Sequence, residues 1–102
     1  MAKLFRGLGD PTRLRILLLL DEGERSVGEL VEELSVPQGR LSSHLACLRW
    51  CGFVRIRRDK RRVLYRLADV QVRDLLKLAD AFLTEHAEHI ELCQLIDDEA
   101  AG

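Results

Sequence analysis

Residues 35–54 read SVPQGRLSSHLACLRWCGFV, and this stretch decides the fold of the chain. Leu41, Leu45 and Leu48 recur at i, i+4 and i+7, which is the spacing of one buried face of an α-helix. We expect this helix to run from Gln38 to Cys51. It should end at Gly52, because glycine readily adopts the left-handed conformation that follows a helix C-terminus.

A second helix comes just before this one. Ser26 is followed three residues later by Glu29, which is the pattern of a capping box at a helix start. Its apolar stripe consists of Val27, Leu30, Val31 and Leu34. Only the tight connection 35–37 separates the two helices, so residues 26–51 predict a helix-turn-helix.

The residues that follow Gly52 predict a β-hairpin. In the stretch FVRIRRDKRRVLYRL (residues 53–67), Val54 and Ile56 alternate with arginines, which is the period of a strand. Residues 58–61 are polar and are expected to form the turn. The hairpin is rich in cations, namely Arg55, Arg57, Arg58, Lys60, Arg61 and Arg62. A helix-turn-helix followed by such a hairpin is the plan of a winged helix.

Helices are also predicted at both ends. Residues 1–8 favour a short helix, and Asp10-Pro11 is a strong start for a second helix that ends at Gly23. Asp69 should cap a final helix from Val70 to Ile96, about 40 Å long at 1.5 Å per residue. So small a body cannot bury the whole apolar face of that helix, so a second copy is expected to cover it. The fold class is thus mainly α with a small β-hairpin, in the order ααααββα.

Length and composition limit the classes of protein. With 102 residues, 47% of them hydrophobic, we expect one domain: a DNA-reading core over 10–68, a dimerisation helix over 69–97 and a frayed tail over 98–102. The longest apolar run, residues 16–20, is too short to cross a membrane. Three cysteines without disulfide-rich spacing indicate free thiols in a reducing cytoplasm.

Charge is distributed unevenly. Residues 1–68 carry 14 Lys/Arg against 8 Asp/Glu, whereas residues 69–102 carry 2 against 9. A basic body suits double-stranded DNA, with the helix in the major groove and the hairpin along the backbone or minor groove. A basic hairpin that binds nothing is the weaker explanation, because element order and charge placement agree. The candidate DNA-binding residues are Gln38, Arg40, Ser42, Ser43, His44, Arg57, Arg58, Lys60, Arg61 and Arg62.

Four segments, GDPTRLRILLLL, VGELVEEL, LSSHLACLRWCGFV and RRDKRRVLYRL, together resemble the ArsR/SmtB family of metal-responsive repressors. The resemblance covers almost the whole chain. It implies a winged-helix homodimer, joined through its first and last helices, that leaves its operator DNA when metal binds. Pro37 departs from the Ser or Thr cap that is usual at the recognition helix.

We expect neither a membrane partner nor a small-molecule substrate. We also expect no enzymatic activity, because the sequence contains no Gly-rich phosphate loop, no paired acid and base, and no Cys-x-x-Cys motif.

Cys47 and Cys51 raise a separate question. On a helix, residues i and i+4 lie about 6 Å apart on one face, so two thiolates there can share a soft metal ion. Two ligands hold an ion poorly, and Cys93 is the other thiol of the chain. Buried cysteines of the core also show helical spacing, so the pattern by itself leaves both interpretations open.

The segment CLRWC is similar to the CmtR-like, cadmium- and lead-sensing branch of the family. That similarity implies a trigonal site of Cys47, Cys51 and, by a looser match, Cys93, supplied by the same or the other subunit. The implied ion is Cd(II) or Pb(II) first, with Hg(II) or As(III) next. His86 and His89 are weaker candidates for additional ligands. The alternative function is a repressor switched by oxidation or persulfidation of its cysteines.

Overall fold

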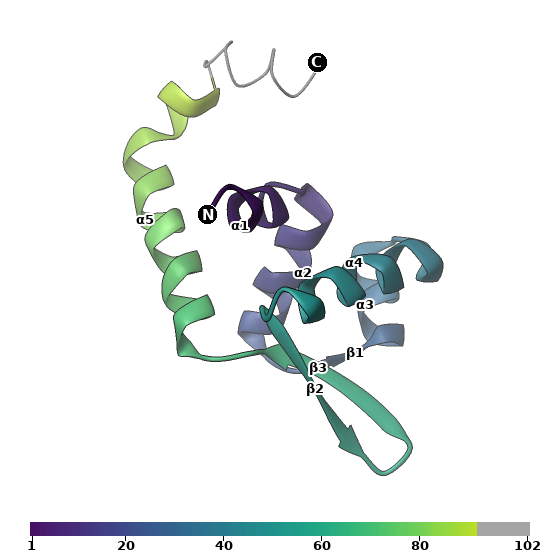
Figure 1. The fold of residues 1–102 in the computed structure, drawn as a ribbon. Coiled ribbons are helices and arrows are strands. Elements are labelled where there is room, and N and C mark those ends of the chain that lie inside the picture. The colour runs from purple at the N-terminus through teal and green to yellow at the C-terminus, as the bar shows by residue number, and fades with distance from the viewer. Residues whose placement is uncertain (92–102) are drawn as a thin grey trace.

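The computed structural model describes residues 1–91 (Figure 1). Its helices are α1 (Ala2–Leu8), α2 (Pro11–Glu22), α3 (Val27–Leu34), α4 (Gln38–Trp50) and α5 (Val70–Glu91). Its strands are β1 (Arg25–Ser26), β2 (Val54–Asp59) and β3 (Arg62–Leu67). Cys93, the predicted end of the last helix at Ile96 and the predicted tail 98–102 lie outside the described residues.

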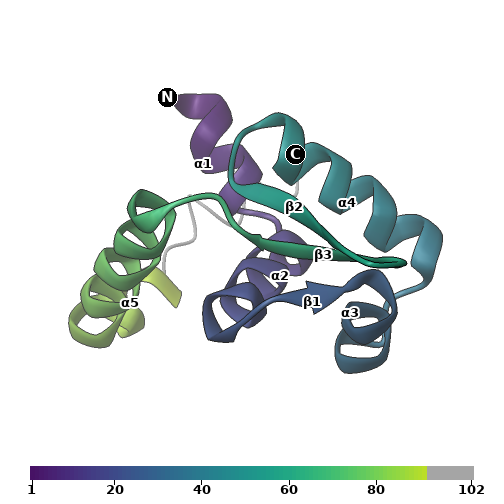
Figure 2. The ribbon, with the colours of Figure 1, turned by 90° about the horizontal axis from the view of Figure 1, so that it is seen from below.

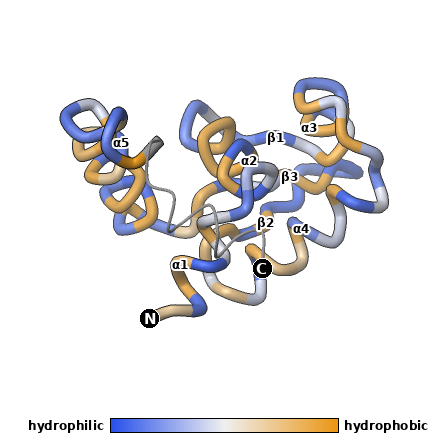
Figure 3. Tube along the Cα trace, turned by 90° about the horizontal axis from the view of Figure 1, so that it is seen from above, coloured by the Kyte–Doolittle hydropathy of each residue, from blue (hydrophilic) through white to orange (hydrophobic). Residues whose placement is uncertain are grey.

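The core lies between α2, α3, α4 and the sheet. Each of the three helices contributes fully buried apolar side chains, such as Leu17, Leu30 and Leu45. In Figure 3 the tube of α2 is coloured hydrophobic over its central turns, in keeping with its place inside the body. Among the described residues, no polar or charged residue is buried, so the core is held by apolar packing.

The predicted helix-turn-helix is confirmed. The Glu29 N–H donates to Ser26 Oγ at 3.2 Å and the Ser26 N–H donates to Glu29 Oε1 at 3.1 Å, which completes the capping box. α4 ends at Trp50, one residue before the predicted Cys51, and Gly52 takes the left-handed conformation with φ of +85°. The start of α4 has no side-chain cap, because Pro37 holds the N-cap position.

The sheet corrects the expected order of elements. Arg25 and Ser26 form a short strand beside β3, so the order is β1-β3-β2 and the predicted ααααββα lacks β1 (Figure 2). β2 and β3 continue to the pair Asp59–Arg62, so the turn of the hairpin is Lys60-Arg61 alone. The predicted turn over residues 58–61 was therefore two residues too long.

Asp10 is a second correction. It occupies the N-cap position of α2 as predicted, but its side chain makes no capping hydrogen bond. Its Oδ2 atom is buried and has no hydrogen-bond partner. The start of α2 thus depends on Pro11 at the first helical position rather than on a carboxylate cap.

α5 runs along one side of the body (Figure 1). It begins as predicted, with Asp69 Oδ1 accepting a hydrogen bond from the Gln71 N–H at 2.8 Å. Val72 and Leu76 are buried against the body, whereas Leu78 and Phe82 farther along are 69% and 56% exposed. α1 buries none of its residues, so both terminal helices carry uncovered apolar surface.

No helix within residues 1–91 combines the length and the apolarity that crossing a membrane requires.

Candidate nucleic-acid interface and thiol pair

The first turns of α4 present polar side chains to solvent. Gln38, Arg40, Ser42 and Ser43 are all exposed, as expected for residues that would reach base edges. Ser43 Oγ donates to the Gly39 carbonyl at 3.2 Å, a bond within the helix. Four of the five residues predicted on this helix are therefore accessible to a partner.

His44, the fifth, is turned toward the body. Its Nδ1 lies 3.5 Å from Arg13 Nη1 and 3.8 Å from Asp10 Oδ2, and its side chain is 18% exposed. Arg13 also donates from Nε to the Gly7 carbonyl at 2.9 Å and from Nη2 to the Arg6 carbonyl at 3.3 Å. Arg13 thus joins the end of α1 to the middle of α4. Sequence reasoning missed this role, although Arg13 lies within the GDPTR segment.

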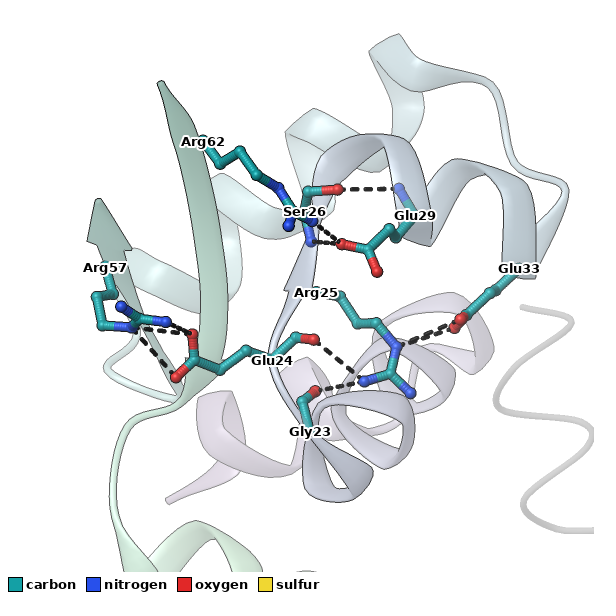
Figure 4. Close-up of polar contacts among 8 residues, drawn as sticks. All are labelled: Gly23, Glu24, Arg25, Ser26, Glu29, Glu33, Arg57 and Arg62. Carbon is teal, nitrogen blue, oxygen red and sulfur yellow. Dashed lines mark hydrogen bonds and ion pairs between the residues drawn. The ribbon is translucent and has the colours of Figure 1, made fainter. Parts of the chain in front are cut away.

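The cations of the hairpin fall into two groups. Arg57 Nη2 lies 2.9 Å from Glu24 Oε2, and Arg62 Nη2 lies 2.6 Å from Glu29 Oε1 (Figure 4). Arg58, Lys60 and Arg61 are exposed and have no ion-pair partner within the described part of the chain. These three exposed cations lie at or beside the tip of the hairpin, where Asp59 is the neighbouring acidic residue.

Cys47 and Cys51 are neighbours at the end of α4. Cys47 is half-buried and Cys51 is exposed, and the Cys51 N–H donates to the Cys47 carbonyl at 3.0 Å. Partial desolvation raises the pKa of the largely exposed Cys51 thiol, and the adjacent Cys47 thiol raises it further. An exposed thiol is not a core residue, so the explanation of both cysteines as core packing does not hold for Cys51.

Cys51 lies where three helices meet. It lines a pocket of about 210 Å³ together with Leu4 of α1 and Val72 and Leu75 of α5. No group of three His, Cys, Asp or Glu residues that could hold a metal ion occurs among the residues that the structure describes. The structure therefore brings two of the predicted sulfur ligands together, while Cys93 lies outside the described residues.

His86 and His89 lie on the outer half of α5. His86 Nδ1 is 2.9 Å from the Phe82 carbonyl oxygen, and its ring stacks on Phe82 with centroids 4.1 Å apart. His89 is exposed. Within residues 1–91, neither histidine joins a group of three potential metal ligands.

Comparison with known proteins points to bacterial regulators. The family model described as "Bacterial regulatory protein, arsR family" matches residues 10–55. A "Probable mercury resistance operon repressor" of Streptomyces lividans is 41% identical over 98 residues, which are 96% of this chain and 78% of that protein. The regulator CmtR of Mycobacterium bovis is 45% identical over 69 residues, which are 68% of this chain and 58% of CmtR.

A solved structure agrees with the fold. The homodimeric winged helix-turn-helix DNA-binding domain of a Mycobacterium bovis protein superposes with a TM-score of 0.79 at 34% identity. The match covers 86% of this chain and 82% of that domain.

Proposed function

Because the chain belongs to the ArsR family of bacterial regulatory proteins, we propose that it is a cytoplasmic, homodimeric repressor of transcription. In this proposal it holds operator DNA until a thiophilic metal ion binds to its cysteines. As a regulator of this family it is a DNA-binding protein and not an enzyme.

DNA binding rests on two surfaces that lie on one body. The exposed start of α4, with Gln38, Arg40, Ser42 and Ser43, has the donors and acceptors that read base edges in a major groove. The exposed cations Arg58, Lys60 and Arg61 supply salt-dependent attraction to phosphates. We assign His44 the task of holding α4 against α2 rather than that of reading a base.

The uncovered apolar faces of α1 and α5 support the proposal that the chain forms a dimer. Phe5 and Leu8 of α1 line an apolar hollow of about 590 Å³ together with Ala79, Phe82 and Leu83 of α5. A hollow so apolar and open is expected to be filled by another apolar surface. The M. bovis relative with this fold is a homodimer, which favours a second copy of the chain as the occupant.

The single observation that carries the metal proposal is the placement of Cys51 at the junction of α1, α4 and α5, with Cys47 one helical turn before it. Thiolate donors select soft ions, so Cd(II), Pb(II), Hg(II) and As(III) are the candidates. We propose Cys93, from either chain, as the third donor. Similarity to a mercury resistance operon repressor favours a role in metal resistance, whereas nothing comparable supports His86 and His89.

The same placement suggests how the ion releases DNA. Cys51 follows the last residue of the helix whose first turns face DNA, and it borders the two helices proposed to form the dimer. An ion held there would fix the angle between the reading helix and the dimer. Because binding free energies are linked, DNA must then weaken metal binding by the same factor by which metal weakens DNA binding.

A titration of single cysteine variants tests this proposal. Thiolate-to-metal absorption and the anisotropy of a labelled duplex, taken from the region upstream of the gene, are followed as Cd(II), Pb(II) or Hg(II) is added. Cys47→Ser and Cys51→Ser should bind DNA like the wild type but require far more metal for release. If the double variant released DNA at the wild-type metal concentration, the cysteines would not be the sensor.

A thiol switch without metal is the second candidate, and the exposure of Cys51 favours it. Two observations count against a direct disulfide between Cys47 and Cys51. Positions i and i+4 on a helix suit disulfide geometry poorly. The raised pKa of Cys51 also leaves less of that thiol as the reactive thiolate. Mass spectrometry after mild peroxide or polysulfide treatment distinguishes the two. The thiol switch would be favoured if modification of the two cysteines abolished DNA binding while metal ions failed to release the unmodified protein from DNA.

A further inference from the structure

One face of α4 borders a hollow in which Ser42 is the one lining residue that was also predicted to contact DNA. Ser42, Ala46, Arg49 and Trp50 lie along that face and, with Tyr65 of β3, line an open space of about 510 Å³. Trp50 is 92% exposed. An indole ring offers a large apolar surface and one N–H donor, so its full exposure indicates a contact that forms with a partner.

The charge around this hollow identifies the kind of partner. Arg49 also lines an adjoining hollow of about 400 Å³, which it shares with Arg55 of β2. Both arginines are exposed, and within the described residues neither has an ion-pair partner. An aromatic ring beside uncompensated cations fits a polyanion better than it fits an apolar or a basic protein surface.

The position of the hollow narrows the choice further. Ser42 belongs both to the polar start of α4 and to the lining of the hollow, so the two surfaces are continuous. α4 packs beside β2, and the hairpin tip carries Arg58, Lys60 and Arg61 (Figure 2). A duplex that touched both α4 and the hairpin tip would therefore pass over the space between them.

We propose that this hollow holds the sugar-phosphate backbone of one DNA strand. Arg49 pairs with a phosphate, the Trp50 ring packs on a deoxyribose, and its Nε1–H donates to a phosphate oxygen. The proposal rests on the DNA binding proposed above and adds Arg49 and Trp50 to the interface. Such contacts position the protein without reading sequence, so they form on any duplex.

Trp50 is the sole tryptophan of the chain, so intrinsic fluorescence reports on this hollow alone. A dye-labelled random-sequence duplex is added to the wild-type protein at low salt, and its anisotropy gives the affinity. Acrylamide quenching of Trp50 should fall by more than half when the protein is saturated with DNA. Trp50→Ala should weaken binding several-fold, and Trp50→Phe should retain most of it.

Arg49→Gln should lower the slope of log affinity against log salt by about one, as expected for the loss of one phosphate contact. Lys77→Gln is the matched control, since Lys77 is an exposed cation on α5, and it should leave the slope unchanged.

The outcomes separate the two proposals. If the duplex binds but quenching stays unchanged and Arg49→Gln behaves like Lys77→Gln, the hollow does not hold DNA and the proposed function stands. If no duplex binds at low salt, DNA binding itself fails. If acrylamide quenching of Trp50 fluorescence in the DNA-free protein falls with rising protein concentration, a second copy covers Trp50 and the inference is overturned.

Discussion

At the scale of single residues, the hairpin cations differ in ways that sequence does not show. Arg57 and Arg58 are adjacent and chemically identical, yet within residues 1–91 Arg57 alone of the two pairs with a carboxylate, that of Glu24. Glu24 lies 33 residues away along the chain, so no local pattern could reveal this pair. The sequence was enough to predict a basic hairpin, but not which of its cations form ion pairs with carboxylates.

Glu24→Gln should strengthen DNA binding. Solvent screens an exposed ion pair, so removing the carboxylate frees Arg57 for a phosphate at little cost to the fold. We expect a few-fold higher affinity for a random-sequence duplex at low salt, with a steeper salt dependence, measured by anisotropy. Glu32→Gln removes an exposed acid of α3 that makes no ion pair among residues 1–90, so an equal gain there would indicate a general charge effect.

Arg13→Gln should destabilise the fold. The guanidinium of Arg13 donates to the carbonyls of Arg6 and Gly7 and approaches His44, and a shorter amide cannot make all three contacts. Loss of these bonds should lower the free energy of unfolding by about 1–3 kcal/mol, measured by urea titration. Lys77→Gln, on exposed surface, should leave it unchanged, and equal stability of both variants would refute the bracing role of Arg13.

At the scale of elements, prediction succeeded where the signal is local. The capping box of α3 and the left-handed Gly52 after α4 depend on residues within a few positions of each other, and both are confirmed. β1 was missed because a two-residue strand shows no alternation and exists only through its pairing with β3. Asp10 shows the converse case: it occupies the N-cap position of α2, as its residue type predicts, but its side chain makes no capping hydrogen bond.

The capping box of α3 should make stability depend on pH. The Ser26 backbone N–H, the Ser26 hydroxyl and Arg62 lower the pKa of Glu29 below its usual value of 4.5. A carboxylate with a lowered pKa stabilises the fold when ionised, so its contribution is complete above the unfolded pKa and disappears as pH falls through the folded pKa. Wild type should therefore exceed Glu29→Gln in Tm at pH 7, and the difference should shrink toward pH 3.

Thermal unfolding followed by circular dichroism gives this comparison. Glu32→Gln serves as the matched control on the same helix, because Glu32 takes no part in the capping box. A Tm difference between wild type and Glu29→Gln that stayed constant from pH 7 to pH 3 would show that the ionised form has no special role.

At the scale of the whole molecule, the sequence predicted the need for a partner but not the complete sensor. The apolar stripe predicted for α5 was too long for its body, and the structure shows Phe82 and Leu83 of that stripe exposed, as that argument requires. The relation of Cys93 to Cys47 and Cys51 depends on how far α5 continues and on which chain faces which. Neither is encoded in local spacing.

Leu83→Glu should separate the proposed dimer. Leu83 lines the apolar hollow between α1 and α5, and a carboxylate there would be desolvated on association. We expect a monomer by sedimentation. Its affinity for duplex DNA should be lower by about a hundredfold, because the second copy's DNA-binding surface is lost. Val70→Glu places the same charge on exposed surface at the start of α5 and should remain dimeric. A dimeric Leu83→Glu protein would place the interface elsewhere.

The apolar faces of α1 and α5 also constrain the DNA itself. Two copies joined through these helices by a two-fold axis meet the two strands in opposite directions, so each copy reads the same bases. The genomic target should therefore be an inverted repeat. Its half-sites should be centred one helical turn, or a whole multiple of one, apart, and inserting half a turn of DNA between them should remove the benefit of the second half-site.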